Sequence, residues 1–517
     1  MRQMEKEELD LKKNDIIDIS ITDMGVNGEG IGRYKGFAFF VKNALPGDTA
    51  RAVVTKINKG YGFAKALEIL SPSPDRVEPP CPLAGKCGGC QIMGLSYKKQ
   101  LEIKESKVWN DLSRIGKEDL SSVIREPVCG MEMEERAGMD SLELTQPSSS
   151  AKAGKGASQA AQPETAFVPL RYRNKVQLPV GLSKDGRPIT GFYAGRTHFI
   201  IEASGCPAAF EGADLLTGLI RNFIEENHIS VYDEKTGRGL VRHILLREGH
   251  NTGQIMVCLV INGKSLNEPS SEEKNRKKAE KENKKTDLEE AFVETLKGSG
   301  LNVASVSLNI NTKKTNVILG EETVLLYGKN YIEEKISDLT FRISPLSFFQ
   351  VNTVQAEKLY AQALKYAALT GEETVWDLYC GTGTISLFLA KKARKVYGAE
   401  IVPEAVEDAR KNAEINGISN AEFLCGKAEE IFPEAVKKGR RADAVVLDPP
   451  RKGCERALLE AVLAAKPSRI VYISCGSATL ARDIGILSAA YELKKIRCFD
   501  MFPHTVHMET AALLELK

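Results

Sequence analysis

The last third of the chain alternates short apolar strands with segments of helical periodicity, and this alternation limits the possible folds more than any other feature. From about residue 347, the apolar runs TVWDL, KVYGAEI, DAVVLDPP and RIVYISC are each followed by a helical segment. Strands joined in this way lie parallel in one sheet, with helices on its faces. We therefore expect residues 346–517 to form a doubly wound, Rossmann-like α/β domain, whose ligands bind outside the carboxyl ends of the strands.

A glycine-rich turn, CGTGT, follows the first of these strands and precedes a helix. Gly381 and Gly383 would let the backbone approach a ligand closely. Glu400 ends the next strand, 19 residues after Gly381, and a carboxylate there can accept both ribose hydroxyls of an adenosine cofactor. NAD and S-adenosylmethionine both fit this pattern. Because Ser386 stands where a third glycine would help to cradle a pyrophosphate, the sequence favours S-adenosylmethionine.

Three further candidate residues follow later strands. Asp448 lies in LDPPRKG, and Arg451 stands where amino-methylating enzymes often carry an aromatic residue, which argues against methylation of an exocyclic amine. Cys475 ends the strand YISC at the same edge of the sheet; it is a candidate nucleophile, or simply a small buried residue. Glu509 could be a general base if the C-terminal segment folds against that edge, although a glutamate near a chain end is normally on the surface.

Residues 8–70 combine short alternating strands with glycine-rich turns, a pattern typical of a small β-barrel. Lys56, Lys59 and Lys65 alternate there with Tyr61 and Phe63. Such a face could contact phosphates and stack on bases. The alternative is a solvated face beside two core aromatic residues.

The overall charge gives no indication of a nucleic-acid partner, because 71 Lys and Arg residues stand against 69 Asp and Glu. No apolar run approaches the about 18 residues of a membrane-spanning helix, and the charged N-terminus lacks an apolar signal core. We therefore expect a cytoplasmic protein with no membrane partner and no obligate protein partner. The 11 cysteines then argue against a disulfide framework and favour metal-binding or nucleophilic roles.

A loop rich in proline and glycine carries Cys81, Cys87 and Cys90 in a C-x5-C-x2-C pattern. Three thiols so close in sequence indicate a metal site that lacks one ligand. The spacing is near that of iron–sulfur proteins, and zinc would also fit. Cys206, in EASGCP, is the best candidate for the fourth ligand because it also lies in a glycine and proline turn.

Residues 71–345 mix strands with a few helical segments, so we expect a central α+β domain. Two polar stretches interrupt it, at about 130–166 and at about 265–290. The first has no apolar period, and we interpret it as a disordered insertion. The second is rich in charges of both signs, and we interpret it as a solvated helix or a tail-like loop.

Several motifs together resemble those of the RNA uridine-5-methyltransferase family. They are DLYCGTGTISL, DPPRKG, YISCGSATLARD and FPHTVHMET, with SPLSFFQVN at residues 344–352, and they agree with the family in order and spacing. The resemblance implies that Cys475 is the nucleophile and Glu509 the general base. It also implies an S-adenosylmethionine site, lined by Gln350, Tyr379, Glu400 and Asp448.

The reaction implied by this resemblance needs these residue types. Uracil C5 is a poor nucleophile, but addition of the Cys475 thiolate at C6 makes C5 enolate-like, so that it can take the methyl group. Glu509 then removes the C5 proton and the thiolate leaves. We expect a depressed thiol pKa in the occupied site and a target uridine that is single-stranded or flipped out. The family usually has Asn-Pro after the nucleophile, whereas Gly476 and Ser477 stand here, so we expect a more flexible loop.

The branch of the family that methylates ribosomal RNA carries a TRAM domain, which is an OB-like RNA-binding barrel, and a [4Fe-4S] cluster. Its four ligand cysteines match Cys81, Cys87, Cys90 and Cys206, and a role in folding the RNA-binding face of the central domain is the simplest role for the cluster. Because the transfer-RNA branch generally lacks both features, the resemblance implies 23S ribosomal RNA as the substrate. The alternatives are a transfer-RNA uridine C5-methyltransferase, a non-catalytic iron–sulfur RNA-binding protein and a nicotinamide oxidoreductase.

Overall fold

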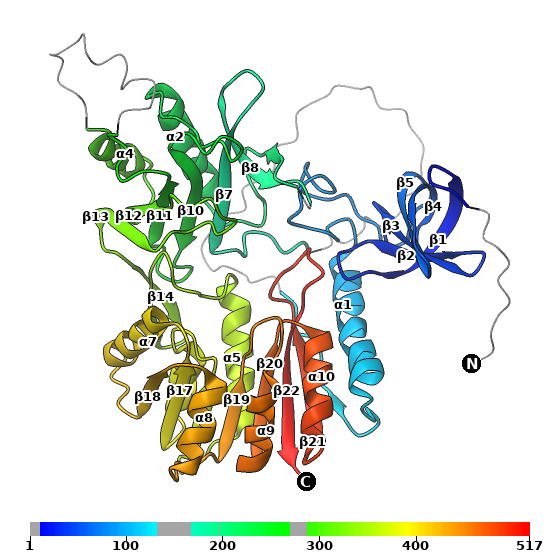
Figure 1. Ribbon diagram of the computed structural model, residues 1–517, viewed down its shortest axis with the longest axis vertical. Helices are drawn as coiled ribbons and strands as arrows, with labels where there is room; N and C mark the ends of the chain where they lie inside the picture. Colours follow the sequence, from blue (N-terminus) through cyan, green and yellow to red (C-terminus); the bar gives the residue numbers. More distant parts are fainter. Residues whose placement is uncertain (1–10, 132–166, 196, 269–286) are drawn as a thin grey trace, which may run out of the picture.

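The structure is a computed structural model, which describes residues 11–131, 167–195, 197–268 and 287–517. A small barrel, a central mixed sheet and a C-terminal sheet flanked by helices form three parts of the molecule (Figure 1). The insertions expected at about 130–166 and 265–290 lie largely outside the described residues. The predicted fold class is confirmed for both the barrel and the C-terminal sheet.

The barrel closes because alternate residues of its strands point inward. In β1, for example, Ile17 and Ile19 are each 2% exposed while their neighbours are exposed. The strands close in the order β1 (Ile16–Met24), β2 (Gly30–Tyr34), β3 (Phe37–Lys42), β5 (Tyr61–Ser71) and β4 (Thr49–Ile57).

Aromatic side chains of the barrel divide between its inside and its outside. Phe39 is fully buried in the core, whereas Phe40, Tyr61 and Phe63 form a separate cluster with ring centroids 5.5–5.6 Å apart. Tyr61 is 41% exposed. Tyr61 and Phe63 are therefore surface aromatic residues rather than core residues.

The central part is a mixed sheet with helices on one face. Every residue of β11 is buried, and α2 and α4 bring Phe223 and Phe292 into contact over the sheet. The order of its strands is β13 (Glu322–Gly328), β12 (Val303–Ile310), β11 (Ile255–Ile261), β10 (Val241–Glu248), β7 (Lys175–Leu182), β8 (Pro188–Tyr193) and β9 (Ile200–Glu202). The helices are α2 (Ala213–Glu226) and α4 (Leu288–Lys297), and the hairpin β14 (Ile332–Ile336) and β15 (Leu339–Ile343) follows.

The C-terminal sheet is doubly wound, with parallel strands buried on both faces. All residues of β16 are buried, as is typical of a strand covered by helices on two sides. The order is β18 (Ala421–Cys425), β17 (Lys395–Glu400), β16 (Thr374–Leu378), β19 (Ala444–Leu447), β20 (Arg469–Ser474), β22 (Glu509–Leu516), β21 (Tyr491–Phe499) and β6 (Ile124–Arg125). The strands from β18 to β20 are parallel, and β22 runs antiparallel to both its neighbours.

Helices cover the two faces of this sheet in separate groups. One hydrophobic core holds residues of α5 (Thr353–Ala367), α6 (Thr384–Ala390) and α7 (Pro403–Ile415), and the other holds residues of α8 (Ala428–Lys437), α9 (Arg456–Ala465) and α10 (Ser477–Leu487). Within the part of the chain that the structure describes, no helix is long and apolar enough to cross a membrane.

An early segment of the chain also packs against the C-terminal sheet. The helix α1 (Tyr97–Asp111), continued by the single turn η1 (Leu112–Gly116), buries Val108 and Leu112 in the same core as α9 and α10 (Figure 1). Strand β6 then adds to the edge of the sheet beside β21. The division into domains at residues 71 and 346 stays a prediction, since α1 and β6 connect the expected central domain to the C-terminal sheet.

A fully buried ion pair fixes α1 to the segment that precedes β22. The Lys104 Nζ lies 2.6 Å from the Asp500 Oδ1, and both side chains are 0% exposed. Lys104 also donates to the Phe502 carbonyl at 3.1 Å. Because removal of one partner would leave an uncompensated buried charge, this pair fixes the position of α1 against that segment.

Candidate active site

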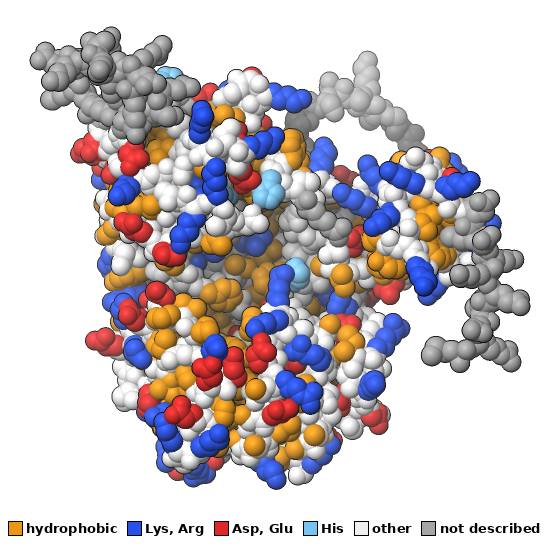
Figure 2. All heavy atoms as spheres, viewed as in Figure 1, with side chains coloured by type: hydrophobic (Ala, Val, Ile, Leu, Met, Phe, Trp, Pro, Cys, Tyr) orange, Lys and Arg blue, Asp and Glu red, His pale blue; other side chains and the backbone are white. Residues whose placement is uncertain are grey.

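A large cavity, of about 1220 Å³, opens at the carboxyl ends of β16, β17, β19 and β20. Its upper wall includes residues 311–321, which link β12 to β13 of the central part. In the space-filling view the molecule is hollowed between the central and C-terminal parts (Figure 2). Most of the predicted site residues line this cavity: Gln350, Tyr379, Gly381, Glu400, Asp448, Cys475 and Glu509.

The glycine turn after β16 leaves room for a ligand. Gly381 has a φ of +54°, and a side chain there would meet nothing within 4 Å. Gly383 differs, because a Cβ at this position would lie 3.0 Å from Ala409 and Phe423, and it does not line the cavity. Gly381 thus faces the ligand space, whereas Gly383 allows close packing of the turn against α7 and β18.

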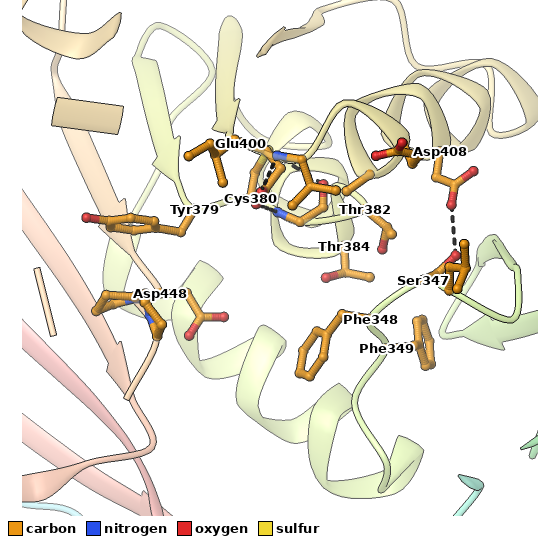
Figure 3. Close-up of a pocket in the computed structure, with 18 of the residues that line it drawn as sticks. Ser347, Phe348, Phe349, Tyr379, Cys380, Thr382, Thr384, Glu400, Asp408 and Asp448 are labelled. Carbon is orange, nitrogen blue, oxygen red and sulfur yellow. Dashed lines mark hydrogen bonds between the residues drawn. The ribbon is translucent and has the colours of Figure 1, made fainter. Parts of the chain in front are cut away.

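The Glu400 carboxylate lies beside this turn, as predicted from its position at the end of β17. It accepts hydrogen bonds from the Gly381 N–H at 3.1 Å and the Val402 N–H at 2.9 Å. The open space before Gly381 and a half-buried carboxylate at its edge fit the ribose of an adenosine cofactor. Tyr379, at a φ of +71°, and Asp448 lie on the same side of the space (Figure 3).

The segment SPLSFFQVN forms another wall of the cavity. Phe348 is 71% exposed, and Phe349 is buried beside it (Figure 3). The Ser347 hydroxyl donates to the Asp408 carboxylate at 2.8 Å, which ties the segment to α7. Asp408 and Phe348 were not among the predicted site residues; the position of Phe348 beside Gln350 in the motif was the available signal.

Cys475 and two carboxyl groups meet in the part of the cavity next to β20 and β22. Burial raises the pKa of the Cys475 thiol to about 11, and the charges of Glu509 and Asp448 add to the increase, while Arg451 opposes it. The free protein therefore keeps this thiol protonated at neutral pH. The depressed pKa that we expect concerns the site with its substrate and cofactor, whereas the protein's own groups act in the opposite direction, because burial and the nearby carboxyl groups raise the pKa of this thiol.

Glu509 is the first residue of β22 and is only 4% exposed. Burial raises its pKa to about 7, against the opposing effect of Arg451. Burial, followed by the charge of Glu509, raises the pKa of Asp448 well above its usual range. A carboxyl group that titrates near neutral pH beside a thiol is well suited to general base catalysis.

The loop before Glu509 is held by elements from the first third of the chain. The Gln100 Oε1 accepts from the His504 N–H at 3.0 Å, and the His504 carbonyl accepts from the Ile92 N–H at 3.0 Å. The Tyr172 hydroxyl donates to the Pro503 carbonyl at 3.0 Å. The position of the candidate base therefore depends on α1 and on the cysteine loop that contains Ile92.

The four predicted metal ligands lie in one neighbourhood of the central part. The pKa of Cys87 is raised by burial and by the thiols of Cys206 and Cys81, and that of Cys90 is raised to about 12 by burial and by Cys206 and Cys87. Over the described ranges, however, no group of three or more His, Cys, Asp and Glu residues is gathered in a way that could hold a metal ion. The four thiols are of the type that metal sites use, but their arrangement in the structure is not that of a metal site.

Comparisons with known proteins agree with this geometry. The profile of a family described as tRNA (Uracil-5-)-methyltransferase matches residues 282–517, and that of the TRAM domain matches residues 11–67. An uncharacterized RNA methyltransferase of Clostridium tetani is 44% identical over 98% of both chains, and one of Halalkalibacterium halodurans is 42% identical over 99% of this chain and 100% of its own. The solved structure of the Pyrococcus abyssi tRNA (uracil-54, C5)-methyltransferase in complex with S-adenosyl-L-homocysteine is 27% identical, with a TM-score of 0.67, over 96% of this chain and 100% of its own.

Proposed function

The chain belongs to the RNA uracil-5-methyltransferase family, and from this premise we propose that it methylates C5 of a uridine in 23S ribosomal RNA through a covalent bond between Cys475 and C6. It is an S-adenosylmethionine-dependent enzyme with an N-terminal TRAM barrel. The observation that carries the covalent route is that Cys475 and Glu509 line the same cavity as Gly381 and Glu400. A thiol, a base and a methyl donor can therefore reach one pyrimidine ring.

Each step of this reaction has a candidate residue. The Cys475 thiol loses its proton to water, the thiolate forms a bond to C6, and the electron pair of the C5–C6 double bond moves onto C5 and O4. Bound S-adenosylmethionine supplies the methyl group. Glu509 takes the proton from C5, the double bond re-forms, and the bond between Cys475 and C6 breaks. Arg451 favours the thiolate, because its charge lowers the pKa of Cys475.

The outer face of the barrel supports an RNA substrate. Its aromatic cluster consists of the exposed Tyr61 and the partly buried Phe40 and Phe63 and can stack on unpaired bases, and Lys and Arg side chains gather on the same part (Figure 2). The target base must leave its stack to reach Cys475, so a barrel that holds single-stranded RNA would help to present that base. A ribosomal substrate implies that the protein works in the cytoplasm.

A transfer RNA is the second candidate substrate, and a specific observation favours it. The Pyrococcus abyssi neighbour, a tRNA methyltransferase by its description, covers 96% of this chain, so the overall architecture does not discriminate between the two RNAs. Mass-spectrometric mapping of 5-methyluridine in RNA from a strain that lacks this protein separates them. We expect loss of methylation at a 23S site with transfer RNA unchanged. Loss in transfer RNA alone would establish the second candidate, and no loss in either RNA would contradict uridine methylation.

We also propose that Cys81, Cys87, Cys90 and Cys206 close around a [4Fe-4S] cluster. Their thiols are near enough to influence each other's pKa, and thiolates are the usual ligands of such clusters. Zinc, which thiolates also bind, is the alternative that the test below separates from a cluster.

Metal analysis tests this proposal. Protein purified without oxygen is expected to contain iron and acid-labile sulfide and to absorb visible light, and Cys206→Ser is expected to lose most of both components. Cys425→Ser, at an exposed cysteine, serves as the control and is expected to keep them. Stoichiometric zinc without sulfide in the unaltered protein would overturn the cluster assignment.

A further inference from the structure

The two residues after the nucleophile differ from the family's usual Asn-Pro, and their structure is informative. Gly476 has φ −138° and ψ 97°, and Ser477 is the first residue of α10. Glycine is the least restricted residue and serine does not fix φ, so the local sequence supplies less stiffness than Asn-Pro would. Another part of the molecule therefore has to fix the turn that carries Cys475.

Ser477 is tied to α1, which lies 366 residues away in the sequence. Its hydroxyl accepts from the Lys107 Nζ at 2.7 Å and donates to the Asp111 Oδ2 at 2.5 Å. The Lys107 Nζ also lies 2.6 Å from that carboxylate oxygen, so the three side chains close a triangle of hydrogen bonds. Ser477 is nine-tenths buried, while Lys107 and Asp111 remain partly exposed.

The helix that bears Lys107 and Asp111 is firmly placed. It lies beside α10 (Figure 1), and at its end Gly116 approaches the Ala481 carbonyl so closely that a Cβ would be 3.0 Å from this oxygen. In the middle of α1, the buried pair of Lys104 with Asp500 holds the helix against the segment that leads to Glu509. One helix thus contacts the turn of the nucleophile and the loop of the base.

Other hydrogen bonds at the turn stay within it or reach the neighbouring loop, where the Thr479 hydroxyl lies 3.3 Å from the Arg451 carbonyl. The Ser474 hydroxyl lies 3.1 Å from the Gly476 N–H, and the Thr479 hydroxyl donates to the Gly476 carbonyl at 2.9 Å. These bonds shape the turn, but they do not connect it to α1. The triangle of Lys107, Asp111 and Ser477 makes that connection.

We propose that Lys107 and Asp111 are positioning residues that hold Cys475 in its reactive place through the Ser477 hydroxyl, and so replace the stiffness of Asn-Pro. This proposal rests on the proposed function, in which Cys475 is the nucleophile. Loss of the triangle would lower the rate by displacing Cys475, because a displacement of about 1 Å in a reacting group can reduce a rate by about 100-fold. Folding should depend little on the triangle, since a partly exposed ion pair contributes little to stability.

The contact of Ser477 with α1 can be replaced by the family's usual Asn-Pro pair in this chain. Proline is favoured at the first position of a helix, and Gly476 already has the extended backbone that a residue before proline prefers. A Cβ at position 476 would come within 2.9 Å of the Thr479 hydroxyl oxygen, so this hydroxyl would have to rotate and give up its hydrogen bond to the Gly476 carbonyl. The pair Gly476→Asn with Ser477→Pro therefore restores the usual sequence at the cost of that local bond.

Kinetics in the two backgrounds test the proposal. Ser477→Ala and Lys107→Met are each expected to lower kcat about 10- to 100-fold, with KM for RNA and the thermal unfolding temperature nearly unchanged. In the Asn-Pro background, Lys107→Met is expected to cause no further loss. Ser477→Thr keeps the hydroxyl and is expected to retain most of the rate, which preserves a test if the Asn-Pro pair folds poorly. Lys98→Met, at an exposed lysine on the first turn of α1, is the control and is expected to behave as the unaltered protein.

Two results would overturn the proposal: wild-type kcat in Ser477→Ala, or an equal loss from Lys107→Met in both backgrounds, which would mean that Lys107 acts directly on the substrate. Alkylation of Cys475, followed on its own peptide by mass spectrometry, adds a readout that needs no RNA. Its rate is expected to change in Ser477→Ala. An unaltered protein without any methyltransferase activity would instead contradict the proposed function, so the two failures are distinguishable.

Discussion

Cys475→Ala is expected to abolish methyl transfer to RNA, because without the thiol no group adds to C6 and C5 stays a poor nucleophile. The loss should reach the background of the assay, which is larger than the effect expected of any positioning residue. Release of tritium from C5-labelled uridine in a 23S transcript measures the reaction, and an RNA–protein band that survives denaturation measures the covalent bond. Both signals should disappear together.

The matched control for this change is Cys425→Ala. Cys425 ends β18, another strand of the same sheet, but it is exposed and does not line the cavity. It should keep full activity, and calorimetry should show that Cys475→Ala still binds S-adenosylmethionine, since the thiol is not part of the adenosine side of the cavity. Appreciable tritium release by Cys475→Ala would rule out the covalent route.

The site residues at the carboxyl ends of the strands could be predicted from the sequence, because residues with suitable chemistry stand where the strands end. Glu400, Asp448 and Cys475 each end or follow a parallel strand, and such positions meet at one edge. Glu509 was harder, since its place follows from β22 returning antiparallel beside β20. From the residues alone it was a candidate only if the C-terminal segment folded against this edge, and the resemblance of its motif was the stronger indication. Gly383 shows the limit of the pattern, because the sequence does not tell a glycine that faces a ligand from one that permits close packing.

Contacts between distant segments were beyond sequence reasoning. Nothing in the periodicity of α1 indicates that Lys107 and Asp111 meet Ser477, because the partners are separated by hundreds of residues and side chains of these types are common on helix surfaces. For the same reason the glycine and serine after Cys475 predicted only a flexible loop. The structure reports a buried Ser477 hydroxyl with two partners, so the stiffness comes from tertiary contacts.

Glu509→Gln is expected to trap the covalent RNA adduct after methyl transfer. The amide has nearly the shape of the carboxyl group but cannot accept the C5 proton, so elimination of Cys475 stalls while its addition continues. Turnover should fall by about 100- to 10,000-fold, the usual contribution of a positioned base. On a denaturing gel, the fraction of protein bound to RNA should rise above that of the unaltered protein.

The pH dependence provides a second readout of the same change. Glu509 acts in its ionised form, and its pKa is raised to about 7, so the rate of elimination in the unaltered protein should rise with pH through about 7 and then level off. In Glu509→Gln this rise should be absent. Stability should move in the opposite direction to activity: because the folded state favours the protonated acid, the free energy of unfolding should fall as the pH rises from about 4.5 to about 7 and stay at the lower level above it. Glu509→Gln removes that loss. The variant should therefore unfold at the same or a higher temperature at pH 8.

A control on the same strand separates loss of the base from loss of charge. Glu515 lies near the end of β22, where its carboxylate is partly exposed beside Arg469, and Glu515→Gln should neither trap the adduct nor alter the pH profile. If Glu509→Gln turns over at the normal rate, another group takes the C5 proton. Asp448 would then be the next candidate, because it is the other carboxyl group whose charge affects the pKa of Cys475.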